Sequence, residues 1–332
     1  MSLTAVLIGC GRIGSTFSDD PLVTGIYSHA SAYVACEATT LVAVCDTDEN
    51  AAKSCAARWG VGRWFTDFRE MLRETSPALV SICTPDHTHG SILEEVLTLP
   101  SVRGVLAEKP FAINPEDAIG LVKVAARTGV KLAVNHIRRY SAGHQDIRRA
   151  IHEGAIGPVQ LVGGYYTKGI LHNGTHWLDL ARWLVGEPVA LRAFHTGRGD
   201  AQDPCLDLYL TFETGARGTL LSADASAFSI FEMDIVGTLG RLHLYDSGHR
   251  TEAWKAGPSS RYSGYLGLVR QGDSESDMTD TVLHAVADLA DCVSKGGTPR
   301  CSGADGAMAI RLAALAIRSA HEGRWVEIGA PA

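Results

Sequence analysis

The first third of the chain alternates continuous apolar runs with more polar segments of helical composition. The apolar runs lie at residues 3–8, 41–46, 78–84 and 102–108. The segments of helical composition between them are 49–59, 68–74 and 91–99. Strands buried on both faces of a parallel sheet are apolar throughout, and strands that alternate with helices form βαβ units. The pattern therefore predicts an N-terminal α/β domain with a doubly wound parallel sheet of the Rossmann type.

Further along the chain, the extended segments begin to follow one another without helices between them. We expect helices at 115–128, 145–153 and 175–185, and strands at 130–135 and 157–167. Further extended segments lie at 189–196, 205–213, 216–223, 230–236 and 240–245. Consecutive strands favour antiparallel pairing. The second domain is therefore predicted to be α+β, with a mostly antiparallel open sheet.

The last part of the chain is predicted to be a loop followed by two helices. Residues 261–277 are polar and rich in glycine, which favours a loop. Residues 280–293 and 304–321 are amphipathic, as expected for helices that cover a core. A chain of 332 residues exceeds the size at which one core usually keeps growing. We therefore expect two domains, at 1–122 and 123–332.

Charge and composition exclude several classes of protein. The formal net charge is -7 and no basic cluster occurs, which argues against a nucleic-acid partner. No apolar stretch approaches a membrane-spanning length, and the N-terminus lacks the sections of a signal peptide. The 8 cysteines contain no C-x-x-C pair, so we expect reduced thiols rather than disulfides or a zinc site. The sequence thus predicts a cytoplasmic protein that does not associate with membranes.

A glycine-rich turn, GCGRIG, directly follows the first predicted strand and is expected to open a helix. Glycines in this context permit a tight turn and let the backbone approach a pyrophosphate, whose charge the helix N-terminus stabilises. An ordinary glycine-rich turn is the alternative interpretation. The residues predicted to contact a dinucleotide here are Gly9, Gly11, Arg12, Ile13 and Gly14.

Asp46 stands at the end of the second predicted strand. A carboxylate at this position can accept hydrogen bonds from both ribose hydroxyls and repels a 2′-phosphate, which favours NAD over NADP. Its separation from Gly14 exceeds the usual spacing of about 20 residues, and we attribute the excess to an insertion at 18–28. If the excess does not come from an insertion, the alternative interpretation is that Asp46 only caps the end of the strand.

The triplet Glu108-Lys109-Pro110 closes the fourth strand of this series. Most lysines lie on the protein surface without a specific role. Open α/β sheets, however, bind ligands at the carboxyl ends of their strands. The position of Lys109 therefore favours a functional role.

These features resemble the glucose-fructose oxidoreductase, inositol dehydrogenase and MocA family over essentially the whole chain. The further motifs that carry the resemblance are TPDHTH at 84–89, NHIRRY at 135–140, GTHWLD at 174–179 and the closing segment 305–328. The resemblance implies a Rossmann domain followed by a larger domain, whose open sheet commonly forms a dimer or tetramer interface. We accordingly expect a homodimer or a homotetramer.

The resemblance also implies roles for individual residues. Lys109 and His176 would flank the reacting hydroxyl, and the peptide bond before Pro110 would be cis. The residues implied at the cofactor are Thr84, Pro85, His89, Glu108 and Lys109. The residues implied at the substrate are Arg138, His172, Asn173 and His176.

Two of these substrate positions have a further interpretation. The family often has Asp where this chain has His172, so a carboxylate that would grip a substrate hydroxyl or orient His176 is missing. Arg138 and Arg139 could instead be a solvated pair on a loop.

The predicted helix 175–185 carries the candidates for proton transfer. Its buried face is predicted to consist of Trp177, Leu180, Ala181 and Leu184. His176 and Asp179, three residues apart, lie within reach of one another. The helix N-terminus disfavours an imidazolium, which suits His176 as a general base while Lys109 stabilises the developing alkoxide and Asp179 orients His176 or binds a hydroxyl.

Two other interpretations of His176 exist. It could be a core histidine, or it could join His172 and Asp179 in a metal site, because the three have i, i+4, i+7 spacing. Gly174 is expected to interrupt the helix between them, which argues against the metal site.

The predicted function is hydride transfer between NAD and a secondary alcohol carbon of a sugar or cyclitol, with NADP as the less favoured cofactor. The first domain would bind NAD, and the second would bind substrate and mediate oligomerisation. One alternative is an NAD-dependent glycosidase that oxidises its substrate transiently. Another is an NAD-binding sensor without catalysis, although a sensor has no need of both Lys109 and His176.

Overall fold

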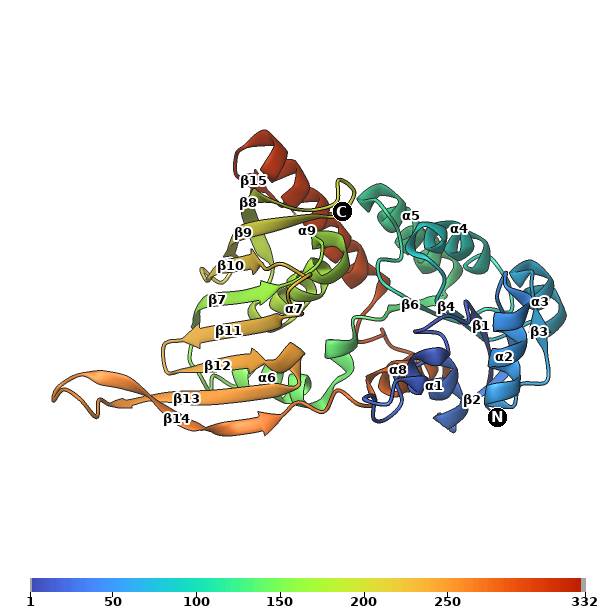
Figure 1. Cartoon of the computed structure of the whole chain (residues 1–332), viewed down its shortest axis with the longest axis horizontal. Coiled ribbons are helices and arrows are strands. Elements are labelled where there is room, and N and C mark those ends of the chain that lie inside the picture. The colour runs from blue at the N-terminus through green and yellow to red at the C-terminus, as the bar shows by residue number, and fades with distance from the viewer. Residues whose placement is uncertain (1, 330–332) are drawn as a thin grey trace. The chain divides into compact units, whose positions relative to one another are not determined.

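Figure 1 shows the computed structural model of the chain, which describes residues 2–329. Contacts between Cα atoms divide the chain into two compact units. Unit 1 comprises the chain up to Tyr140 together with Thr279–Ala307, and unit 2 comprises Ser141–Met278 and the chain from Met308. No helix among the described residues has both the length and the apolar character needed to cross a membrane.

Within residues 2–329, unit 1 contains a six-stranded parallel sheet in the order β3-β2-β1-β4-β5-β6. Its strands are β1 Leu3–Ile8, β2 Thr39–Cys45, β3 Trp64–Phe65, β4 Leu79–Ile82, β5 Gly104–Ala107 and β6 Lys131–Val134. This is the Rossmann strand order, so the predicted fold class of the first domain is confirmed. The order reverses between β1 and β4, and ligands bind such sheets outside the strand ends at this point.

The helices of unit 1 begin and end where the sequence provides local signals. They are α1 His29–Ala35, α2 Glu49–Trp59, α3 Phe68–Thr75, α4 Asp86–Val96, α5 Pro115–Thr128 and α8 Thr281–Lys295. The Asp48 side chain accepts a hydrogen bond from the N–H of Asn50 at the start of α2. That helix ends at Gly60, whose φ of 67° is left-handed and suits glycine.

The expected boundary between residues 122 and 123 lies inside α5, and the structure divides the chain elsewhere. The strand β6 pairs with β5 and completes the Rossmann sheet. The helix α8, expected in the second domain, packs on the same unit: a Cβ atom at Gly104 would lie 2.8 Å from Val293. This packing depends on long-range contacts, which local hydrophobic patterning does not reveal.

Unit 2 contains a nine-stranded sheet within the described residues, in the order β14-β13-β12-β11-β7-β10-β9-β8-β15. Its strands are β7 Val159–Tyr166, β8 Pro188–Gly199, β9 Pro204–Phe212, β10 Arg217–Ser222, β11 Phe231–Gly237, β12 Gly240–Tyr245, β13 Arg250–Pro258, β14 Leu266–Glu275 and β15 Val326–Glu327. Among these described strands, β7 and β10 pair in parallel and the other neighbours are antiparallel. The predicted mostly antiparallel sheet is therefore confirmed.

One face of this sheet forms the core of unit 2. Helices α7 Thr175–Val185 and α9 Gly303–Glu322, the latter from Met308 on, contribute Trp177 and Leu312 to a buried cluster with sheet residues such as Met233. The helix α6 Ala142–His152 adds Ile147 to the same cluster. The face of α7 predicted to be buried, which includes Trp177, is buried.

The segment 261–277, expected to be a loop, is mostly a strand. β14 pairs antiparallel with β13, and the resulting hairpin extends beyond the neighbouring strands of unit 2 (Figure 1). Most residues of β14 are exposed, so the strand lacks the alternation of apolar and polar residues that a half-buried strand shows. The expectation of a loop was wrong because a hairpin that is solvated on both faces carries no such signal.

Candidate functional site

The glycine-rich turn of unit 1 requires glycine at two positions for different reasons. Gly9 has a φ of +96°, and a Cβ atom there would lie 2.6 Å from the backbone carbonyl of Cys83. A Cβ atom at Gly14 would lie 2.1 Å from the carbonyl oxygen of Gly9. At Gly11 no atom lies within 4 Å of the Cβ position, so the backbone is open to a ligand on that side.

Only one turn of helix follows the glycine-rich segment, whereas the sequence predicts a continuous helix there. The N–H of Ser15 donates to the carbonyl of Gly11 at 2.8 Å, and a short 3₁₀ helix, Thr16–Asp19, follows. The helix resumes only at α1, where the N–H groups of His29 and Ala30 donate to the carbonyls of Ile13 and Gly14 at 3.0 and 2.9 Å. The chain between them thus interrupts the helix that usually follows such a turn.

The interrupting segment also determines where the Arg12 side chain lies. Its guanidinium pairs with the Asp20 carboxylate at 3.1 Å, and the Arg12 side chain is 67% exposed. Neither Arg12 nor Ile13 lines the crevice described next, although both were predicted to contact the cofactor.

A crevice of about 940 Å³ opens along the carboxyl ends of the strands of unit 1. Gly9, Gly11, Asp46, Thr84 and Pro85, all predicted cofactor residues, line it. Asp46 has two further contacts. Its carboxylate accepts hydrogen bonds from the N–H of Cys10 at 2.8 Å and from the N–H of Asp48 at 3.0 Å, so it also fixes the glycine-rich turn.

His89 holds two segments of unit 1 together. Its ring is fully buried; Nδ1 lies 2.8 Å from the carbonyl oxygen of Pro110 and Nε2 lies 2.6 Å from that of Thr84. The side chain therefore connects the loop after β4 with the loop after β5 and does not line the crevice.

Glu108 is buried and belongs to a polar network that the sequence does not reveal. Its Oε1 lies 3.0 Å from His29 Nε2 and accepts a hydrogen bond from the Asn135 side-chain amide at 2.6 Å. On the other side of the fully buried His29 ring, Nδ1 lies 2.9 Å from the Ser81 hydroxyl. These partners are 52 to 79 positions away from His29 in the chain.

The network keeps Glu108 ionised. Burial alone would raise the pKa of its carboxyl, but the hydrogen bond and charge of His29, the Asn135 amide and the Lys109 charge outweigh that effect and lower the pKa to about 2. The second carboxylate oxygen of Glu108 accepts from the N–H of Lys109 at 3.3 Å. A fixed negative charge therefore lies beside the lysine predicted to act in catalysis.

Lys109 is half-buried, and the peptide bond between it and Pro110 is cis, as the resemblance implied. Arg138 and Arg139 follow β6 and are both buried, so the interpretation as a solvated pair on a loop was wrong. Arg139 pairs with Asp305 at 3.1 Å and donates to the carbonyl of Arg300. Burial lowers the pKa of the Arg138 guanidinium, which nevertheless remains charged at neutral pH.

In unit 2, the predicted proton-transfer helix has the expected bounds, Thr175–Val185, but helical structure directly precedes it. A π-helical turn, Ile170–Gly174, leads directly into α7. Gly174 has helical φ and ψ of -59° and -37°, so it does not interrupt the helix as the sequence analysis expected. π-Helical turns of this kind often occur at functional sites.

His176 and Asp179, both predicted catalytic residues, lie in the first turns of α7. His176 is half-buried, whereas Asp179 is 2% exposed, which suits a residue that orients a neighbour. No group of three or more His, Cys, Asp or Glu side chains among residues 2–329 is arranged to hold a metal ion.

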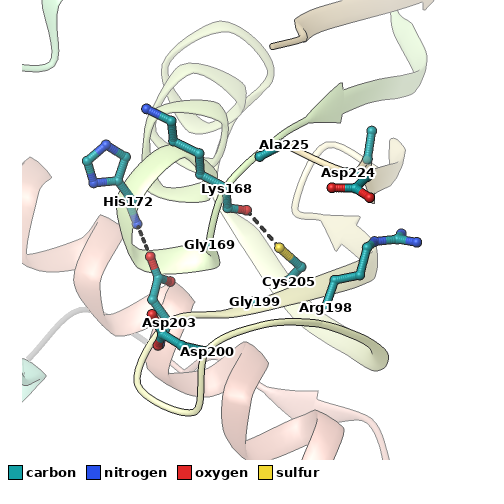
Figure 2. Close-up of a pocket in the computed structure, with 11 residues that line it drawn as sticks. Lys168, Gly169, His172, Arg198, Gly199, Asp200, Asp203, Cys205, Asp224 and Ala225 are labelled. Carbon is teal, nitrogen blue, oxygen red and sulfur yellow. Dashed lines mark hydrogen bonds between the residues drawn. The ribbon is translucent and has the colours of Figure 1, made fainter. Parts of the chain in front are cut away.

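His172 and Asn173, predicted to bind substrate, lie in the π-helical turn. The carboxylate of Asp203 accepts a hydrogen bond from the N–H of Leu171 at 2.6 Å and another from the N–H of His172 at 3.1 Å. Figure 2 shows the second of these. Asp203 could not be predicted from the sequence, because it lies in the connection between β8 and β9 without a motif around it.

The crevice of unit 1 fits a dinucleotide. Its glycine-rich wall is open at Gly11, a carboxylate lies at the end of β2, and its volume lies within the range of about 300–1,000 Å³ typical of ligand pockets. Together with the Rossmann strand order, these features define a dinucleotide-binding domain.

The chain belongs to the Gfo/Idh/MocA oxidoreductase family. Residues 3–136 match the family's NAD-binding Rossmann fold, and residues 162–328 match its C-terminal alpha/beta domain. The predicted family is thereby confirmed. 

Several characterised proteins are similar over nearly their full length. The D-apiose dehydrogenase of Paraburkholderia graminis is 27% identical and aligns over 97% of this chain and 88% of its own. The inositol 2-dehydrogenase of Rhizobium meliloti is 25% identical and aligns over 99% of this chain and 100% of its own. Among solved structures, a levoglucosan dehydrogenase in complex with NADH shares the fold with a TM-score of 0.83 at 19% identity, over 99% of this chain and 100% of that chain.

Proposed function

We propose that the protein oxidises a secondary alcohol of a sugar or cyclitol, or reduces the corresponding ketone, with NAD as the hydride acceptor or donor. The observation that carries the proposal is the glycine-lined crevice of unit 1, which opens at the carboxyl ends of β1, β2 and β4. Lys109 follows β5, the strand next to β4 in the same sheet. The relatives named as apiose and inositol dehydrogenases, similar over almost the whole chain, support the substrate class.

In the proposed mechanism, two side chains act on one alcohol oxygen. His176 removes the hydroxyl proton, and the N-terminus of α7 favours the neutral imidazole that this step needs. The Lys109 ammonium donates a hydrogen bond to the same oxygen and stabilises its developing negative charge. The bound NAD supplies the acceptor for the hydride that leaves the carbon. In ketone reduction, His176 returns the proton.

Other residues position these two side chains or the cofactor. Asp179 orients His176, a role for which its burial at the next turn of the helix suits it. Glu108 holds the backbone N–H of Lys109 and provides a counter-charge to the ammonium. Asp46 selects NAD, because its carboxylate accepts hydrogen bonds from ribose hydroxyls and repels a 2′-phosphate.

A spectrophotometric screen tests the proposal. Sugars and cyclitols are incubated with NAD or NADP, and NADH formation is followed for the wild type, Lys109→Met and His176→Ala. We expect each substitution to lower kcat by at least about 100-fold, because each removes a group that acts on the transition state. Wild-type turnover by both variants on the best substrate would contradict the catalytic assignment.

We also propose that the protein is a cytoplasmic homodimer or homotetramer that associates through the open face of the unit 2 sheet. Five apolar side chains on that face are 38–49% exposed, namely Leu161, Tyr165, Phe194, Tyr209 and Leu221. An apolar face of this kind is typical of an interface. No disulfide occurs among the described residues and all eight cysteines are buried, as is usual in a reducing compartment.

A further inference from the structure

A pocket of about 370 Å³ lies within unit 2, at the end of β7 and beside the π-helical turn that leads into α7. The connections between β8 and β9 and between β10 and β11 complete its walls. Its charged and titratable lining residues are Lys168, His172, Arg198, Asp200, Asp203 and Asp224 (Figure 2). The pocket thus combines cations with carboxylates, and its selectivity depends on which of them remain available to a ligand.

The three carboxylates already accept hydrogen bonds from the chain itself. The donors are the N–H groups of Leu171 and His172 for Asp203, of Gln202 and Asp203 for Asp200, and of Ser226 for Asp224, at 2.6–3.1 Å. A Cβ atom at Gly169 would lie 1.9 Å from the Asp203 carboxyl carbon, so glycine is required there for this contact. The carboxylates therefore serve to shape the loops around the pocket.

The Lys168 and Arg198 side chains are less engaged. No hydrogen bond or ion pair joins the Lys168 ammonium to another residue in the part of the chain that the structure describes. Arg198 donates from Nη2 to the carbonyl of Ser222 at 2.8 Å, which leaves most of its five N–H donors for other partners. Figure 2 shows the Lys168 ammonium and the His172 ring on the same side of the pocket.

The backbone at Lys168 is strained. Its φ of +68° is in the left-handed region, which a non-glycine residue adopts at a cost. The Lys168 carbonyl accepts a hydrogen bond from the Cys205 thiol at 3.1 Å, which helps to hold this conformation. Strained residues of this kind gather at ligand-binding sites, where the surrounding structure enforces them.

The pocket adjoins the proposed general base along the chain. His172 lines the pocket, and His176 follows four residues later in the same helical segment. Residues four apart on a helix lie on one face, separated by about 6 Å along the axis. A group bound at Lys168 and His172 could therefore belong to the same sugar whose hydroxyl His176 deprotonates.

We propose that this pocket binds an oxyanion group of the substrate, a carboxylate or a phosphate, and that the substrate is therefore an anionic sugar. Lys168 provides the charge that recognises the oxyanion, and the His172 ring, on the same side of the pocket, provides a further hydrogen-bond donor. The inference rests on the proposed function, since it assigns the substrate class of the same site.

The test compares sugars that differ only in the anionic group. NADH formation is measured with D-glucose, D-glucuronate and D-glucose 6-phosphate, and with D-galactose and D-galacturonate. We expect kcat/KM to be at least tenfold higher for an anionic sugar than for its neutral counterpart. Lys168→Met should lower this ratio by about 10- to 100-fold, the loss expected for a hydrogen bond to a charged group, and Lys168→Arg should retain most of it. Preference for the carboxylate or the phosphate series identifies the oxyanion.

Lys255→Met, at an exposed lysine of β13 in the same unit, is the matched control and should leave the ratio unchanged. Equal turnover of neutral and anionic sugars by the wild type would overturn the inference and leave the proposed function intact. If no sugar or cyclitol in the wider screen yields NADH, the proposed function fails. The inference is then judged by calorimetric titration of the NAD-saturated protein with D-glucuronate and D-glucose 6-phosphate, where binding that does not depend on Lys168 would overturn it.

Discussion

Replacing His29 by leucine should destabilise unit 1 strongly, because it removes the partner of a buried carboxylate. The His29 ring is fully buried between the Ser81 hydroxyl and the Glu108 carboxylate. His29→Leu leaves Glu108 charged, buried and without its main counterpart. Removal of one partner from a buried ion pair typically costs about 3–5 kcal/mol.

The pKa of Glu108 gives the net effect of its surroundings on the carboxylate, which combines burial with His29, Asn135 and Lys109. Its fall from the ordinary value of 4.5 to about 2 corresponds to about 3 kcal/mol of stability at neutral pH. Since the folded-state pKa is depressed, this contribution is present above pH 4.5 and is lost as the pH falls towards 2. The difference in stability between wild type and variant should therefore narrow over this acidic range.

Thermal unfolding followed by circular dichroism measures the effect. For a unit of this size, each kcal/mol shifts Tm by about 2–4 °C, so His29→Leu should lower Tm by roughly 6–20 °C at pH 7. His29→Gln keeps an N–H donor for Glu108, so its Tm should fall by less than that of His29→Leu. The double variant that combines His29→Leu with Glu108→Leu should show a smaller fall in Tm than His29→Leu alone, because it leaves no unpaired charge. His152→Leu, at an exposed histidine of α6, is the control.

The reasoning would be refuted if His29→Leu melted within about 2 °C of the wild type, a shift that corresponds to less than about 1 kcal/mol. It would also be refuted if the double variant were less stable than His29→Leu. That outcome would mean that Glu108 is stabilised by partners other than His29, and that the pair does not act as a unit.

Four further substitutions test the cofactor and oligomer assignments. Gly11→Ala should raise the Kd for NAD about tenfold in calorimetric titration without changing Tm. Gly9→Ala should also lower Tm, because the added Cβ atom would meet the backbone. Equal Tm values for the two variants would contradict this expectation. Asp46→Ser should lower kcat/KM for NAD relative to NADP, and an unchanged ratio would remove Asp46 from cofactor selection. Tyr209→Glu, on the open face of unit 2, should reduce the mass measured by light scattering after gel filtration, whereas Lys255→Glu should not; an unchanged mass for Tyr209→Glu would place the interface elsewhere.

Local signals made much of the fold predictable. The helices α2 and α7 have the predicted bounds, because periodic apolar positions and nearby stop signals such as Gly60 define them within the segment. The glycine-rich turn was found from the spacing of its glycines, although the contact that requires Gly9 is with Cys83, which follows β4 far along the chain. Such features depend on residues close in the chain or on a spacing that many folds share.

Features that depend on distant contacts could not be predicted in this way. The interruption between the glycine-rich turn and α1 was detected as an unusual spacing, but the role of His29 depends on Ser81 and Glu108, which lie far away in the sequence. The helix α8 carries an amphipathic pattern that fits either unit. Lys168 is an ordinary lysine in the sequence, and only its left-handed backbone and its place in a pocket distinguish it.

The position of His172 links the sequence to the proposed substrate class. The family resemblance implied Asp there, but in this structure the carboxylate of Asp203 already accepts hydrogen bonds from the N–H groups of Leu171 and His172. A second carboxylate at 172 would add like charge beside Asp203 and would repel an anionic substrate held by Lys168. A histidine at this position avoids the repulsion and offers a donor instead. His172→Asp should therefore weaken turnover of an anionic sugar more than that of its neutral counterpart, and a variant that favoured the anionic sugar more strongly than the wild type would contradict this account.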